Sequence, residues 1–178
     1  MNERLRIVTL CTGNAARSVM LGYMLAEISE VSGVDWRLRT AGTHVVEGQA
    51  MSSRTRDALR SVDQLGPHHY EQHRSHQLTS DDVAWADIVL GVEANHVNYV
   101  RAQFPDDAGK AVQLTQFVRD APRGKAIVEQ LLAVSRLELD GALDIPDPAG
   151  KAQAAYDVCA TTLWRLTKLF FDVVTLTN

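Results

Sequence analysis

The chain has 178 residues, of which 46% are hydrophobic and 22% are charged. This length suits one domain with a substantial core, and the composition excludes disorder as the state of the whole chain. The formal net charge of -4 argues against nucleic acid as a partner, because binding it requires a broad basic face. A single phosphate group needs only a few backbone N–H groups and one arginine, whatever the net charge.

Cysteine usage and the first ten residues bear on the cellular compartment. Cys11 and Cys159 are the two cysteines of the chain, too few for a disulfide framework. Residues 1–10 lack the apolar stretch of a signal peptide, and no segment approaches the roughly 18 uninterrupted apolar residues of a membrane span. We therefore expect a cytoplasmic protein that does not associate with membranes.

Predicted strands and helices alternate along the chain. Apolar, β-branched runs predict the strands, and apolar residues at helical spacing predict the helices. This alternation indicates an α/β fold: a single domain over residues 1–178, with a four-stranded parallel sheet and helices on both faces. In chain order the predicted elements are a strand at 5–10, a helix at about 18–31, a strand at 36–40, a helix capped by Ser52, a short helix beginning at Thr79, a strand at 86–92, a helix at about 93–103, a strand at 111–114 and a last helix from about Ala149.

Two segments in the C-terminal third show distinct apolar patterns. The segment 118–142 is interrupted by Pro122 and Gly124, and its apolar residues predict an extra helix, so it is a candidate insertion. In the last helix, the helical spacing places Cys159 on the apolar inner face, as a core residue. The residues that carry these two patterns are Ile127, Leu131, Leu132 and Leu137 in the segment, and Tyr156, Cys159, Leu163, Leu166, Phe170 and Val173 in the helix.

The segment between the first strand and the first helix carries the chemistry. It lies at the carboxyl end of the sheet, where ligands bind in such folds. A tight loop here turns its backbone N–H groups inward as an anion-binding nest, and the following helix adds its own N-terminal N–H groups. We expect it to bind the phosphate of a substrate through the residues Thr12, Gly13, Asn14, Ala15, Ala16, Arg17 and Ser18.

Within this loop, Cys11 is the candidate nucleophile. A helix N-terminus and a neighbouring arginine favour the reactive thiolate, and Ser18 can donate a hydrogen bond to it. Gly13 allows an unusual backbone angle, and the forked guanidinium of Arg17 can bind two phosphate oxygens. A buried structural cysteine is the alternative interpretation, but the strand–loop–helix context favours catalysis without any cofactor.

The sequence CTGNAARS at 11–18 resembles the signature of low-molecular-weight protein tyrosine phosphatases. The segments Thr40–Thr43, His73–Leu78, Ala86–Leu90 and Asp147-Pro148 are also similar to family segments. The resemblance implies hydrolysis of phosphate monoesters, in a phosphorylated protein or a small aryl or alkyl phosphate, through a phosphocysteine. It also implies that Asn14 holds the loop in shape and that His73 supports it.

A leaving alkoxide or phenoxide needs a proton donor in the transition state. Asp147 is the candidate, because it precedes Pro148 on the loop before the last helix and matches the family's general-acid position. Asp144 is the nearest rival, and Asp-Pro pairs are also common turns. The histidines at 68, 69, 73 and 76 form a cluster, but without thiolate neighbours they do not predict a metal site.

Three departures from the family pattern stand out. Ala16 occupies the position where many members have a second cysteine, and neither 44–48 nor Ala149 supplies the aromatic wall expected at those positions. Two alternatives to phosphate-ester hydrolysis therefore stay open. One is arsenate reduction, which would require an external thiol; the other is a non-catalytic, oxyanion-binding regulatory protein.

Overall fold

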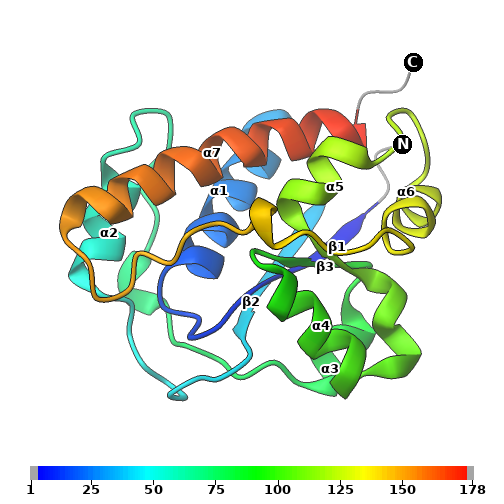
Figure 1. Ribbon diagram of the computed structural model, residues 1–178. Helices are drawn as coiled ribbons and strands as arrows, with labels where there is room; N and C mark the ends of the chain where they lie inside the picture. The colour runs from blue at the N-terminus through cyan, green and yellow to red at the C-terminus, as the bar shows by residue number, and fades with distance from the viewer. Residues whose placement is uncertain (1–3, 176–178) are drawn as a thin grey trace.

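The computed structural model describes residues 4–175 and has a parallel four-stranded sheet at its centre (Figure 1). Its strands are β1 (Leu5–Cys11), β2 (Trp36–Gly42), β3 (Ile88–Gly91) and β4 (Ala111–Gln113), in the order β2-β1-β3-β4. Leu5 pairs with Trp36, and Ile7 pairs with Ile88. The predicted α/β fold is confirmed, and the two central strands bring their carboxyl ends to the same edge.

Side chains of the central strands alternate between two apolar cores, as the period of a strand requires. Ile7 joins the core beneath α1 (Arg17–Ser32), α5 (Leu114–Asp120) and α7 (Gln153–Thr175). Val8 joins the core on the other face, against α3 (Ser80–Trp85) and α4 (Ala94–Gln103). Figure 1 shows the two groups of helices on opposite sides of the sheet.

The smaller elements complete the domain. Helix α2 (Ser53–Arg60) packs on α7, and α6 (Ile127–Val134) packs beside α5. Ser52 caps α2 as predicted, because its Oγ accepts the Thr55 backbone N–H at 3.1 Å. Three short 3-10 helices are η1 (Tyr70–Gln72), η2 (Pro105–Lys110) and η3 (Gly141–Leu143). No helix within residues 4–175 is long and apolar enough to cross a membrane.

Two predictions about the C-terminal third differ from the structure. The last helix begins at Gln153 rather than near Ala149, because Gly150 has a φ of 75° and the Lys151 N–H closes a turn on Pro148 O. The extra helix in 118–142 is confirmed as α6, but Leu132 on it is 50% exposed. Helix α5 was not predicted: its first residue, Leu114, was placed at the end of the predicted strand at 111–114, and its last residues fell in the candidate insertion that begins at Val118.

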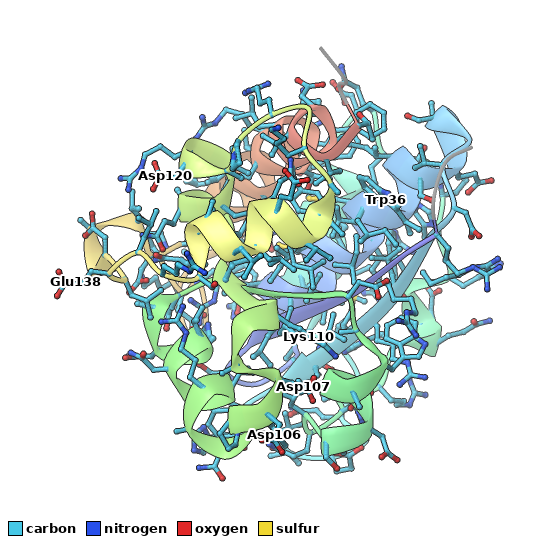
Figure 2. All side chains as sticks on the ribbon, turned by 90° about the vertical axis from the view of Figure 1, so that its right-hand side faces the viewer. Trp36, Asp106, Asp107, Lys110, Asp120 and Glu138 are labelled. Carbon is cyan, nitrogen blue, oxygen red and sulfur yellow. The ribbon has the colours of Figure 1, made fainter. Side chains whose placement is uncertain are left out.

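Helix α6 lies at the amino ends of the strands, away from Cys11. Together with the strand starts it lines a cavity of about 800 Å³, whose wall includes Trp36, Lys110 and Leu131. Figure 2 faces this side of the molecule, with Trp36 and Lys110 beside the helix. Neither Cys11 nor Arg17 lines this cavity. Helix α6 therefore adds no apolar wall to the predicted phosphate pocket.

Candidate active site

Asn14 forms the structural centre of the loop between β1 and α1. It is fully buried and has a φ of 49°, a left-handed conformation that asparagine tolerates better than most residues. Its Nδ2 donates to Ser18 Oγ and to Thr40 Oγ1, both at 2.9 Å. Its Oδ1 accepts the backbone N–H of His76 at 2.9 Å. One side chain thus ties the loop to α1, to β2 and to the segment after η1.

The backbone carbonyl of Asn14 is held from outside the loop. His73 Nε2 donates to it at 2.8 Å, and Ser75 Oγ donates at the same distance. Burial lowers the pKa of His73, which favours the neutral ring. The ring needs only one N–H for this contact. The structure therefore places His73 directly behind the loop, in contact with Asn14.

The end of β2 packs against the loop at very short range. A Cβ added at Gly42 would lie 2.5 Å from Thr12 O and 2.9 Å from Asn14 N, so only glycine fits there. The next two residues donate to the loop: Thr43 N to Cys11 O at 3.0 Å and His44 N to Thr12 O at 2.9 Å. These contacts fix the first residues of the loop as a continuation of the sheet.

Cys11 is the last residue of β1 and is buried, with its Sγ 3.0 Å from Ser18 Oγ. Because Asn14 Nδ2 donates to that same hydroxyl, the Ser18 proton is available to the sulfur. The sulfur also lies just ahead of α1, which begins at Arg17. A hydroxyl donor and a helix N-terminus both favour a thiolate.

Arg17 is 2% exposed, and three groups surround its guanidinium. NH1 donates to Ile145 O at 2.9 Å and to Glu93 Oε1, and NH2 contacts Asp147 Oδ2 at 2.9 Å. The Nε–H is not used in these contacts. The guanidinium is therefore oriented by two carboxylates and one carbonyl before any anion enters.

The two candidate acids have different surroundings. Asp147 is 44% exposed; its Oδ1 accepts the Ala149 N–H at 3.0 Å while Oδ2 faces Arg17. Asp144 Oδ1 instead accepts the Ala94 N–H at 2.6 Å, at the start of α4, and Gln113 Nε2 at 2.7 Å. Asp144 thus joins α4 to β4. Asp147 is the carboxylate placed at the mouth of the loop.

Two residues that follow β3, at the start of α4, were missed from the sequence. Glu93 contacts Arg17, and His96 is buried with its Nε2 3.0 Å from Thr12 Oγ1. The one available signal was their position after a buried strand, at the edge where ligands bind. Glu93 and His96 are the N-cap and N3 residues of the capping box that starts α4, but they do not have the usual Ser/Thr and Glu/Gln residue types, so residue type and spacing alone did not indicate them.

The rim of the site carries little aromatic surface. Val46 is exposed, and Ala149 follows the Asp-Pro pair without a ring. His44 lies at the rim with its ring 5.8 Å from that of Tyr99 on α4, an aromatic residue that the sequence did not assign to the site. The Tyr99 hydroxyl is held by Gln77 at 3.2 Å. The imidazole of His44 and the phenol of Tyr99 therefore form a small aromatic surface on one side of the rim.

The remaining histidines and the second cysteine have separate environments. His68 Nε2 lies 2.7 Å from Glu27, and His76 Nε2 lies 2.8 Å from Asp82. Within the described residues 4–175, no three potential ligands converge on a metal position. Cys159 is buried in the core between α7 and the sheet, and burial raises the pKa of its thiol to about 12.

Comparison with known proteins gives a consistent assignment. The sequence model described as "Low molecular weight phosphotyrosine protein phosphatase" matches residues 6–176. Two proteins named protein-arginine-phosphatase are similar: that of Geobacillus stearothermophilus is 32% identical over 113 residues, and that of Bacillus subtilis (strain 168) 28% over 112. These matches cover 64% and 63% of this chain, respectively, and 71% of each relative.

A solved structure extends the likeness to the whole fold. The low-molecular-weight protein tyrosine phosphatase from T. tengcongensis superposes with a TM-score of 0.75 at 26% identity, covering 94% of this chain and 97% of that one. The family match spans almost the entire described chain, including the loop and the carboxylates around Arg17. The chain therefore belongs to the low-molecular-weight phosphotyrosine protein phosphatase family and is a cysteine-dependent hydrolase of that family.

Proposed function

We propose that this protein dephosphorylates phosphoarginine in proteins, with Cys11 as nucleophile and Asp147 as general acid. The observation that carries the proposal is the pair of carboxylates, Glu93 and Asp147, on either side of Arg17 at the mouth of the loop. Glu93 is 22% exposed and Asp147 44% exposed, so both carboxylates reach solvent. The names of the two relatives that are 32% and 28% identical support the same substrate class.

The charge of the leaving group explains why carboxylates matter. Cleavage of a phosphoarginine P–N bond releases a guanidine, which becomes a guanidinium cation once it is protonated. Guanidinium groups pair well with carboxylates and also stack on aromatic faces such as the His44–Tyr99 edge. A phenol leaving group can take a proton from Asp147 but does not become a cation, so it gains no ion pair with these carboxylates, and its recognition depends on aromatic walls. Val46 and Ala149 supply no such wall.

The proposed reaction has two steps. The Cys11 thiolate attacks phosphorus as the bond to the guanidine nitrogen breaks, and Asp147 gives its proton to that nitrogen. Water then attacks phosphorus, Asp147 takes a proton from the water, and the S–P bond breaks to release inorganic phosphate. Throughout, Arg17 and the loop N–H groups hold the phosphoryl oxygens, on which charge accumulates.

The contacts of Arg17 suggest how Asp147 becomes available. In the absence of an anion, Asp147 Oδ2 is paired with Arg17 NH2 at 2.9 Å. A phosphoryl group in the loop competes for that N–H, because both are anions that bind the same fork. We infer that substrate binding releases one carboxylate oxygen from Arg17 and turns it towards the leaving group.

Two other reactions are weighed against the same features. Phosphotyrosine hydrolysis is the second candidate, favoured by the likeness to a tyrosine phosphatase structure at 26% identity. Arsenate reduction needs further thiols after the first adduct. Cys159 is a poor candidate for that role, because its raised pKa keeps the buried thiol protonated at neutral pH.

The test compares two peptides that differ at one residue. The same peptide sequence carries phosphoarginine in one version and phosphotyrosine in the other, and kcat/KM is measured for both at neutral pH. Cys11→Ser is the matched control, because it keeps the loop and Arg17 but should abolish turnover of both peptides. We expect at least a tenfold preference for phosphoarginine, about 1.4 kcal/mol in transition-state binding.

The opposite preference would overturn the substrate proposal while leaving the cysteine mechanism intact. Substantial turnover by Cys11→Ser would instead overturn the mechanism. Arsenate, supplied with several thiol donors, is included as a third substrate. Faster arsenate consumption than peptide dephosphorylation would assign the protein to the reductase reaction.

A further inference from the structure

His96 lies beneath the candidate active site and contacts both sides of it. It is a residue of α4, is 2% exposed, and its Nε2 lies 3.0 Å from Thr12 Oγ1. Its Nδ1 lies 3.1 Å from the backbone nitrogen of Glu93. Gly91, the last residue of β3, makes room for it: a Cβ added there would lie 3.1 Å from His96 Cβ.

The partners of the ring determine where its proton lies. A backbone N–H can only donate, so Nδ1 must accept from Glu93 and cannot carry a proton. The neutral imidazole therefore carries its proton on Nε2, which donates to Thr12 Oγ1. Thr12 is exposed at the start of the loop. Because its oxygen accepts from His96, its own hydroxyl proton is free to point towards the rim.

We propose that His96 is a positioning residue for the phosphatase reaction: through its two ring nitrogens it fixes Thr12 on the nucleophile side of the loop and Glu93 on the Arg17 side. Thr12 directly follows Cys11, and Glu93 is an ion-pair partner of Arg17. The ring holds the Glu93 backbone in the capping box that starts α4, and the Glu93 carboxylate pairs with Arg17, so one ring connects the two sides of the loop. His96 acts on the loop itself, so its role is the same whichever phosphorylated residue is the natural substrate.

Electrostatics around the ring keep it in the state that these contacts require. Burial, the largest cause, and the neighbouring Arg17 cation lower the pKa of His96, while Asp144 and Asp147 act in the opposite direction, and the net result is a pKa of about 4. Glu93 Oε2 also lies 3.7 Å from Nε2. At neutral pH the ring is therefore uncharged, and Nδ1 remains able to accept the Glu93 N–H.

The experiment measures turnover of an aryl phosphate and protection of Cys11 by inorganic phosphate against iodoacetate. Thr12→Val keeps the shape of an exposed side chain and removes the acceptor, so folding should be unchanged while kcat/KM falls about tenfold. His96→Leu removes both ring contacts and should lower kcat/KM at least as much. His96→Gln retains an amide donor near the Nε2 position and should recover part of the loss.

The double variant Thr12→Val/His96→Leu distinguishes positioning from general damage. If the two residues act through one hydrogen bond, the double variant is no worse than His96→Leu alone. Thr161→Val, on the exposed side of α7, is the matched control and should leave kcat/KM unchanged. Additive losses would overturn the proposal.

If His96→Leu fails to fold, Thr12→Val alone still tests the positioning role of His96. Normal turnover and normal phosphate protection in Thr12→Val, at an unchanged melting temperature, would overturn that role. Because both readouts use only an aryl phosphate and inorganic phosphate, they do not depend on the phosphoarginine proposal. The phosphoarginine proposal is tested separately, by the comparison of the phosphoarginine and phosphotyrosine peptides.

Discussion

The Arg17 guanidinium and the Asp147 carboxylate face each other across the mouth of the loop, with NH2 2.9 Å from Oδ2. Arg17 is almost completely buried, whereas Asp147 is 44% exposed. The arginine is thus fixed by the interior, and the carboxylate reaches it from a surface loop. This difference in burial suits an Arg17 that stays in place to bind the phosphoryl group and an Asp147 that moves when the substrate enters.

Asp147→Asn should slow substrates with basic leaving groups far more than activated ones. A general acid matters most when the leaving group is a strong base, so we expect a loss of about 10²–10⁴-fold for an alkyl or phenyl phosphate. A nitrophenyl phosphate should lose much less. The measurement is kcat/KM across a series of leaving groups.

Asp144→Asn is the matched control for this series. Asp144 accepts hydrogen bonds from the start of α4 and from Gln113, so this variant should lower stability more than it changes leaving-group dependence. A steeper leaving-group dependence in Asp144→Asn than in Asp147→Asn would identify Asp144 as the general acid. No dependence in either variant would place the acid elsewhere.

Arg17→Lys should impair turnover strongly although it keeps the positive charge. The guanidinium fork contacts Glu93, Ile145 O and Asp147 at once, and a lysine ammonium has neither its planarity nor its reach to all three. Charge spreads over the equatorial phosphoryl oxygens in the transition state, where a fork binds best. Steady-state kinetics with an aryl phosphate checks this.

Arg37→Lys is the control, since Arg37 is 59% exposed and pairs with Asp35 on the surface. It should leave kcat/KM unchanged. Near-normal activity in Arg17→Lys would mean that Arg17 does not bind the phosphoryl group in the way proposed.

The sequence predicted the parts of the site that lie close together along the chain. The first strand, the loop and the helix after it are contiguous, so residue type and spacing identified Cys11 and Arg17 together, and the resemblance to the family pointed to the role of Asn14. Their local geometry follows from short-range rules: a strand, a nest and a helix N-terminus. Asp147 was found because proline follows it and the family has an acid at this position.

The parts that could not be predicted depend on packing between distant segments. Glu93 meets Arg17 only because β3 lies beside β1 in the sheet. Tyr99 reaches His44 because α4 and the end of β2 meet at the same edge. The late start of α7 at Gln153 reflects a left-handed Gly150, which a pattern of apolar residues does not reveal.

Asn14→Gly should separate the side-chain role of Asn14 from its backbone role. Glycine adopts the φ of 49° without strain, so any loss reports the hydrogen bonds to Ser18, Thr40 and His76. We expect the free energy of unfolding to fall by roughly 1–3 kcal/mol, because buried partners lose their hydrogen bonds. Denaturant unfolding and aryl phosphate turnover are the measurements.

Asn14→Ala is the companion variant. It loses the same hydrogen bonds and adds strain at a positive φ, so it should be less stable than Asn14→Gly. Equal stability of the two variants would show that the backbone conformation contributes little. Wild-type stability and turnover in Asn14→Gly would contradict the role of the side chain.

The buried His96 predicts a loss of stability in mild acid. The unfolded chain takes up a proton on this histidine near pH 6.5, but the folded chain does so only near pH 4. The folded-state pKa is lowered, so this contribution to the free energy of unfolding is complete above about pH 6.5. It is lost progressively as the pH falls to about 4, by roughly 3 kcal/mol at about 1.4 kcal/mol per unit.

His96→Gln has no titrating group at this position, so its free energy of unfolding should fall less steeply between pH 6.5 and 4 than that of the wild-type protein. Denaturant unfolding at a series of pH values checks this, and above pH 7 the two curves should run parallel, whatever the offset between them. His73 and His76 also titrate, but they are present in both proteins and cancel in the difference. If the two curves stay parallel down to pH 4, His96 is not held neutral by its surroundings. The proton assignment that links it to Thr12 and Glu93 would then be wrong.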